Sequence, residues 1–192
     1  LPGLISMSVL FGTTSMLAVT ITFERSGRSF ERLLLAPISL NTLVLAKISG
    51  TILFGLFNAF VPVIFASFFV DLKGIVWGVA FFAVVMIAIT SSLMGLLIAV
   101  SAKQVFEAQT FSNFFRFPML FLCGLFVPIV KLPVFLRPVS YCLPLTYGTD
   151  ILKGMINTTN TLSPALSFAI LLIFVVLLFV VCRYNINRKW IL

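Results

Sequence analysis

The chain has 192 residues, of which 61% are hydrophobic and only 9% are charged, and its mean hydropathy is +1.21. Soluble domains carry about 25% charged residues, so this composition excludes an ordinary water-soluble globule and favours the lipid bilayer as solvent. The net charge of +8 comes from basic residues scattered between apolar runs, which favours anionic lipid headgroups over nucleic acid as their partner.

Long runs without charge predict membrane-spanning helices. Charged residues are absent from 1–23, 48–70, 74–102 and 154–182. Each run exceeds the roughly 20 residues that cross about 30 Å of hydrocarbon. A fifth span is obtained if a helix begins near Ala108 and Arg116 snorkels to the headgroups. The predicted fold class is therefore all-α, a polytopic membrane helical bundle with five visible spans at about 1–23, 44–70, 74–101, 108–130 and 162–182.

Polar uncharged residues inside these spans are candidates for a substrate pathway. The candidates are Thr13, Thr14, Asn58, Thr90 and Ser91. The alternative is that they hydrogen-bond between helices, as polar residues in membrane bundles often do. Three glycines are predicted to allow close helix packing: Gly50, Gly55 and Gly95.

The segment 24–40, between the first two spans, is predicted to form a short amphipathic helix at the membrane surface. Ser29 is a suitable N-cap, and Pro37 ends the element. One face of this helix carries Phe30, Leu33 and Leu34, and the other carries Arg28 and Arg32. Ser39 is then the predicted cap of the next long helix. The alternative is a solvated connector that lies on the headgroups.

The segment 131–153 is apolar but cannot form one continuous helix. Three prolines interrupt it: Pro133, Pro138 and Pro144. Because irregular backbone in hydrocarbon must be covered by protein or water, we expect a pair of short helices that re-enter from the outer face. Tyr141 and Tyr147 would lie near the outer interface. The alternative is an ordinary extracellular loop on the lipid surface.

The distribution of basic residues predicts the orientation. With the segment 24–40 in the cytoplasm, nine basic residues lie inside: Arg25, Arg28, Arg32, Lys47, Lys103, Arg116, Arg183, Arg188 and Lys189. Four lie outside: Lys73, Lys131, Arg137 and Lys153. This asymmetry agrees with the positive-inside tendency and predicts a cytoplasmic C-terminus. The first residue is Leu1, so we expect the chain to be N-terminally incomplete, with one further span that would give six.

Catalytic, cofactor-binding and metal-binding residues are not expected in this chain. It contains no histidine and no P-loop motif, and its three cysteines are far apart. The carboxylates are expected in loops or at membrane edges: Glu24, Glu31, Asp71, Glu107 and Asp150. An ion-coupled carrier usually keeps an ionisable group at depth, so this pattern disfavours one. The polar residues within the spans are sparse, which disfavours a passive channel. The missing histidine and the lack of paired buried acids disfavour a membrane enzyme.

Two stretches resemble motifs of type-2 ATP-binding-cassette (ABC) exporter permeases. The first resembles that family's loop between its second and third helices: Glu24-Arg25, Gly27, Phe30-Glu31-Arg32-Leu33-Leu34, Ala36-Pro37-Ile38-Ser39 and Lys47. The second resembles its fifth helix and outer hairpin: Phe117-Pro118, Cys123-Gly124, Pro128, Leu132-Pro133, Leu136, Pro144-Leu145-Thr146-Tyr147, Asp150 and Lys153-Gly154. The chain departs from the family at Cys123, where a serine is common, and in lacking the first spanning helix.

The resemblance implies a permease in the plasma membrane that moves an amphiphilic substrate (lipid, drug or polysaccharide) outward by alternating access. It implies a homodimer or heterodimer of permeases in the lipid bilayer, and two nucleotide-binding ATPase subunits that hold ATP and Mg²⁺ themselves. The implied ATPase-coupling residues are Glu24, Arg25, Arg28, Phe30, Glu31, Arg32, Leu33, Leu34 and Pro37. The implied outer hairpin or gate contains Pro128, Pro133, Pro144, Tyr147 and Asp150. The alternative function is a non-transporting membrane protein for binding or assembly.

Overall fold

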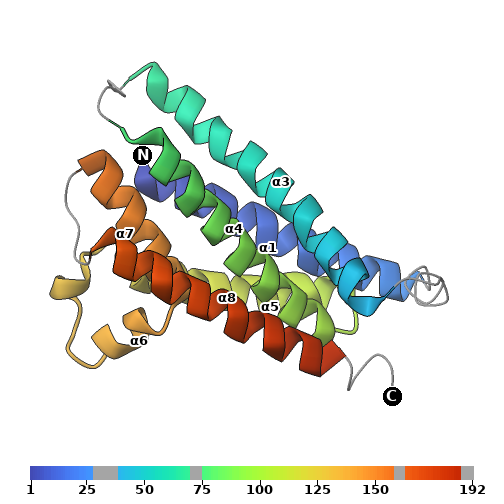
Figure 1. Cartoon of the computed structure of the whole chain (residues 1–192). Helices are drawn as coiled ribbons and strands as arrows, with labels where there is room; N and C mark the ends of the chain where they lie inside the picture. The colour runs from blue at the N-terminus through green and yellow to red at the C-terminus, as the bar shows by residue number, and fades with distance from the viewer. Residues whose placement is uncertain (28–38, 70–74, 158–162, 187–192) are drawn as a thin grey trace.

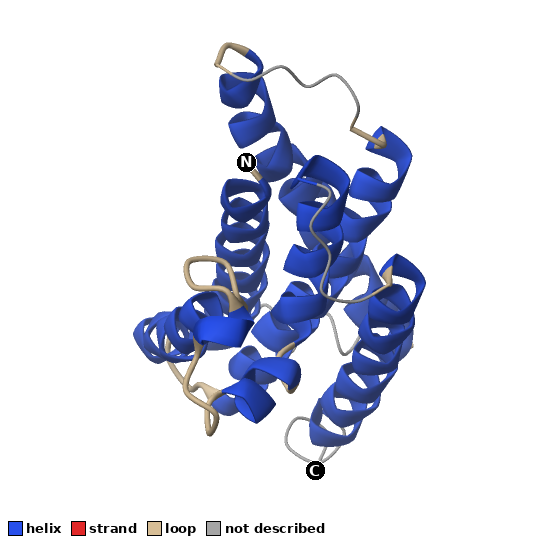
Figure 2. Cartoon of the chain, turned by 90° about the vertical axis from the view of Figure 1, so that its left-hand side faces the viewer, coloured by secondary structure: helices blue, strands red, loops and turns tan. Residues whose placement is uncertain are grey.

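The computed structural model describes residues 1–27, 39–69, 75–157 and 163–186, which form helices joined by turns (Figures 1 and 2). The long helices are α1 (Pro2–Ser26), α3 (Leu40–Ser67), α4 (Trp77–Ser101) and α8 (Pro164–Ile186). The shorter elements are α5 (Val105–Leu122), the 3-10 turn η1 (Ile129–Lys131), α6 (Arg137–Tyr141) and α7 (Pro144–Asn157). No strand occurs within these described ranges, and the predicted all-α class is confirmed.

The four long helices are long and apolar enough to cross a membrane. They overlap the predicted spans 1–23, 44–70, 74–101 and 162–182. Local chemistry explains where they begin. The backbone N–H of Thr42 donates to Ser39 Oγ at 3.2 Å, which confirms the predicted cap of α3. Proline, whose missing N–H costs nothing in a first turn, opens both α1 and α8.

Helices α1 and α4 form the centre of the bundle. Helix α3 packs on both of them, α5 packs on α1, and α8 packs on α4 and α7 (Figure 1). The bundle has two ends that differ in chemistry. The end at which α1 finishes and α3 begins holds Glu24, Arg25 and Lys47, and we call it the charged end. The opposite end holds Leu1 and the residues 123–153, which we call the hairpin segment, and it is the hairpin end.

Two glycines allow α1 to approach its neighbours closely. A Cβ atom added at Gly95 would lie 2.7 Å from the backbone oxygen of Thr14, and one added at Gly55 would lie 2.4 Å from Thr13 Cγ2. Such contacts bring backbones together in membrane bundles, and the prediction for these two glycines is confirmed. The same prediction is wrong for Gly50, which is exposed and has no atom within 4 Å of an added Cβ.

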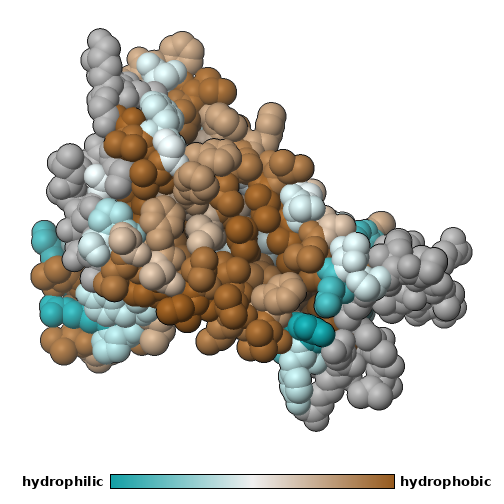
Figure 3. Space-filling view, viewed as in Figure 1, coloured by the Kyte–Doolittle hydropathy of each residue, from teal (hydrophilic) through white to brown (hydrophobic). Residues whose placement is uncertain are grey.

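The outward faces of α3 and α8 are strongly apolar. Exposed side chains on these faces include Leu53, Phe57, Phe60, Ile64, Phe65, Leu172, Ile173, Val176, Leu177 and Val180. Figure 3 shows this apolar surface along the helices, with hydrophilic atoms gathered near the two ends. An exposed apolar surface of this extent is typical of a protein surrounded by lipid.

The predicted span 108–130 corresponds to a shorter helix. Helix α5 begins at Val105 and ends at Leu122, so its 18 residues measure about 27 Å. Gly124 then adopts a φ of +78°, a conformation that glycine takes without strain, and the chain turns into the hairpin segment. Helix α5 is not among the four helices that meet the length and hydropathy requirements for a span.

Candidate functional site

At the charged end, α1 and α3 are joined by an ion pair between Glu24 and Lys47. Both side chains are about one-fifth to one-quarter exposed, so the pair is partly shielded from water. The pair lies on the two helices that lead into and out of the residues 28–38. It therefore joins these two helices near that segment.

Arg25 fastens the same end of α1 to α4. Its Nη1 donates to the carbonyl oxygens of Ala99, at 2.9 Å, and Ala102, at 3.2 Å. These carbonyls belong to the C-terminus of α4, where the helix dipole favours a cation and orphan acceptors are available. Helices α1, α3 and α4 are thus tied together beside the predicted coupling segment.

Of the predicted coupling residues, the structure describes Glu24 and Arg25. Both contact other helices of this chain: Glu24 pairs with Lys47 of α3, and Arg25 bonds to the end of α4. The other predicted coupling residues lie outside the described residues: Arg28, Phe30, Glu31, Arg32, Leu33, Leu34 and Pro37. Their role stays a prediction.

Arg116 is buried between α5 and α1, and the prediction that it reaches the headgroups is wrong. Its side chain is 1% exposed. Its Nη2 donates to Ser15 Oγ at 2.7 Å, its Nε donates to the Ser112 carbonyl at 3.1 Å, and its Cζ lies 4.9 Å from the centroid of the Phe11 ring. These partners compensate for the lost water, so the guanidinium has no need to extend to the surface.

The depth of Arg116 makes it notable. Its partner Ser15 lies near the middle of α1, one of the four helices long and apolar enough to span the membrane. Within the described ranges no carboxylate forms an ion pair with it. A charge at such depth in a membrane bundle is costly and usually has a function. Sequence reasoning missed the pairing because the acceptor, Ser15, is about one hundred residues away in the chain.

The predicted pathway residues lie inside the bundle. Thr14 Oγ1 donates across the α1–α4 contact to the Ser91 carbonyl at 3.3 Å, whereas Thr13 and Thr90 donate to carbonyls of their own helices. Asn58 is half-buried, and its side chain lies against Gly12. Thr14 alone of these threonines supports the alternative of bonding between helices, because the bonds of Thr13 and Thr90 stay within their own helices. A role in a pathway stays a prediction, and it would require α1 and α4 to separate.

Side chains of α7 bond to backbone carbonyls elsewhere in the hairpin segment. Thr149 Oγ1 donates to Cys123 O at 3.0 Å, and Lys153 Nζ donates to Gly124 O. Tyr147 is buried, and its hydroxyl donates to Tyr141 O at 2.7 Å. Three side chains of α7 therefore hold the hairpin segment together, two of them at the residues that directly follow α5.

The remaining predicted gate residues surround the same region. Pro128 precedes η1, Pro133 separates η1 from α6, and Pro144 is the first residue of α7. Asp150, expected in a loop or at a membrane edge, lies within α7 and is 7% exposed. It lines a cavity of about 220 Å³ together with Thr149 and Lys153.

Metal ligands do not gather anywhere in the part of the chain that the structure describes, because no three His, Cys, Asp or Glu side chains come together there. The three cysteines, Cys123, Cys142 and Cys182, are free thiols. The described residues therefore offer helices tied together at the charged end, a buried cation and internal hydroxyls.

Comparison with known proteins identifies the family. The family model described as "ABC-2 type transporter" matches residues 1–157, most of the chain. The chain belongs to the ABC-2 type transporter family. This makes it the transmembrane permease subunit of an ABC transporter, an integral multi-pass membrane protein whose partner is an ATP-binding subunit.

Curated relatives of this ABC-2 permease carry transport names. The inner membrane transport permease YadH of Escherichia coli (strain K12) is 27% identical over 187 residues, which are 97% of this chain and 73% of YadH. YadH of Shigella flexneri gives the same values. The probable multidrug ABC transporter permease YbhR of Escherichia coli (strain K12) is 24% identical over 156 residues, which are 79% of this chain and 42% of YbhR.

Proposed function

We propose that this permease exports an amphiphilic substrate, of the lipid, drug or polysaccharide type, outward across the plasma membrane by alternating access. A separate ATPase subunit docks at the charged end and binds the ATP and Mg²⁺ that supply the energy. The permease works as a homodimer or heterodimer, with the charged end and the C-terminus in the cytoplasm. The printed name of YbhR, a probable multidrug transporter permease, supports the exporter class.

The observation that carries the proposal is the fastening of the charged end. Helix α1 precedes the residues 28–38, and α3 follows them. The Glu24–Lys47 pair joins α1 to α3, and the bonds from Arg25 to the last carbonyls of α4 join α1 to α4. A displacement of that segment by the ATPase would therefore move α1, α3 and α4 together. A partner shifts such an equilibrium only by binding the two states with different affinity, so the segment must contact the ATPase differently in each.

The hairpin segment supplies the opposing gate in this proposal. Thr149 and Lys153 bond to the carbonyls of Cys123 and Gly124, which directly follow α5, and in this proposal the two bonds hold the gate closed. Arg116 ties α5 to α1 through Ser15, so a movement of α1 at the charged end reaches α5 and then the hairpin segment. In this proposal, these contacts transmit the movement caused by the ATPase at the charged end to the gate at the hairpin end.

The double variant Arg32→Glu, Leu34→Asp tests the coupling. We expect it to insert into the membrane in normal amounts but to lose export and substrate-stimulated ATP hydrolysis, because the charge at position 32 is reversed and the apolar side chain at position 34 is replaced by a charged one. The measurement is export together with ATP hydrolysis by the complete transporter in lipid vesicles.

The matched control is Lys103→Glu, which reverses an exposed charge at the same end but outside the predicted coupling segment. It should retain both activities. Normal export and normal stimulated hydrolysis in the double variant would show that the segment does not carry the coupling.

A further inference from the structure

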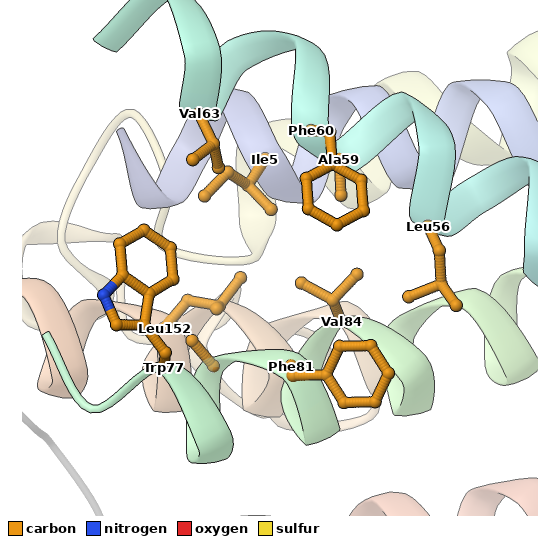
Figure 4. A pocket seen from close by; sticks show the side chains of 10 residues that line it. Ile5, Leu56, Ala59, Phe60, Val63, Trp77, Phe81, Val84 and Leu152 are labelled. Carbon is orange, nitrogen blue, oxygen red and sulfur yellow. The ribbon is translucent and has the colours of Figure 1, made fainter. Parts of the chain in front are cut away.

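A small cavity lies between α3 and α4 near the hairpin end, away from the fastened charged end (Figure 4). Its volume is about 90 Å³. Four elements supply its walls, with α1 and α7 behind and α3 and α4 on either side. The side chains that line it are Ile5, Leu56, Ala59, Phe60, Val63, Trp77, Ala80, Phe81, Val84 and Leu152.

Small residues create this space. Ala59 on α3 and Ala80 on α4 line the cavity, and their short side chains leave room between the two helices. The floor is part of the bundle core, since Ile5, Val84 and Leu152 are all buried. The cavity is therefore a defined depression in the packed bundle rather than a gap at a frayed helix end.

The lining determines which ligand the cavity accepts. Every lining side chain is apolar or aromatic, so a water molecule would find almost none of the polar partners it needs. Apolar cavities of this kind stay dry and bind apolar molecules. The headgroup of an amphiphile, or any ionised ligand, would lose its hydration there without compensation.

The side toward the surroundings is apolar as well. Phe60 and Phe81 line the cavity from α3 and α4, and about half of each side chain is exposed. The neighbouring exposed residues on these helices, Phe57, Ile64 and Phe82, are also apolar. In a membrane-spanning bundle, the medium that meets these side chains is the hydrocarbon of the bilayer.

The position along the helices fits the depth of acyl chains. Trp77 is the first residue of α4, where an aromatic ring typically marks the boundary between headgroups and hydrocarbon. Val84 lies seven residues further, about 10 Å deeper.

We propose that the cavity is a lipid site that holds part of one phospholipid acyl chain between α3 and α4. This inference requires the membrane location of the chain but not its transport activity.

Trp77 provides an intrinsic reporter for the site. The experiment uses the complete permease with every tryptophan except Trp77 replaced by phenylalanine, including Trp190→Phe, purified in detergent. Phosphatidylcholine with brominated acyl chains is then titrated in, because bromine quenches tryptophan fluorescence on contact. We expect saturable quenching of Trp77, and loss of most of it in Ala59→Leu and in Ala80→Leu, which fill the cavity.

The control is Ala46→Leu, the same change at an exposed position of α3 near the charged end. It should keep the full quenching, and the two filling variants must elute as folded proteins of unchanged size. Quenching that does not saturate, or that is equal in the filled variants, would mean contact with surrounding lipid only and would overturn the proposal. Absence of quenching would overturn it too, because another protein surface would then cover the cavity. Neither outcome bears on ATP-driven export, which is measured separately.

Discussion

We expect Ser15→Ala to lower the free energy of unfolding of the permease by about 2 kcal/mol, because the buried Arg116 donates to this hydroxyl. The substitution removes the acceptor that lies 2.7 Å from Arg116 Nη2 and leaves this buried charged group short of one partner between α1 and α5. A bond to a charged group costs more to lose than a neutral one. The measurement is reversible unfolding in mixed micelles with increasing SDS.

Measuring Ser15→Ala in a protein that also carries Arg116→Met isolates the contribution of the Arg116–Ser15 bond. In Arg116→Met the charge is absent, so Ser15→Ala should cost only a few tenths of a kcal/mol there. The exposed hydroxyl of Ser101, which bonds within its own helix, provides the control Ser101→Ala, with a small effect in both backgrounds. Equal costs of Ser15→Ala in the two backgrounds would show that the hydroxyl does not serve the arginine.

Gly95→Ala tests the close contact between the backbones of α1 and α4. The added Cβ would lie 2.7 Å from the Thr14 carbonyl oxygen and 3.2 Å from Thr14 Cα, and backbone atoms cannot rotate away as a side chain can. Helices α1 and α4 must move apart, so we expect a loss of about 2 kcal/mol, within the usual cost of overpacking. The measurement is again unfolding in SDS, together with the yield of folded permease.

Gly50→Ala is the matched control, since an added Cβ there meets no atom within 4 Å. Alanine forms helix more readily than glycine, so this variant should be as stable as the unmodified protein or up to about 1 kcal/mol more stable. The two glycine variants should therefore differ in sign. A Gly95→Ala protein as stable as Gly50→Ala would contradict the packing of α1 on α4.

The spanning helices could be predicted from sequence because the bilayer penalises charge so strongly. Runs without charge located α1, α3, α4 and α8, and the Ser39 cap followed from one side chain at the right place. What sequence could not supply is the identity of distant neighbours. Arg116 was expected at the headgroups because the pattern of charges does not reveal that Ser15 and Phe11 would enclose it.

The contacts of the packing glycines and of the candidate site could not be predicted from sequence either. Gly50 and Gly95 are indistinguishable in the sequence, yet only Gly95 faces the backbone of α1. The threonines of the predicted pathway could be recognised as polar residues in spans, whereas their partners depended on how α1 and α4 meet. Glu24 and Lys47 belong to the stretch that resembles the family motif, but their mutual ion pair required the three-dimensional arrangement.

The central claim is that the charged end, with the residues that lead to the segment 28–38, faces the cytoplasm where an ATPase can reach it. Single-cysteine permeases decide this, with the reporter either at the native Cys142 of the exposed hairpin end or introduced by Ser26→Cys beside that segment. With a membrane-impermeant maleimide on intact cells, Cys142 should react from outside, and Ser26→Cys only after permeabilisation. Reaction of Ser26→Cys in intact cells would place the charged end outside and contradict the account.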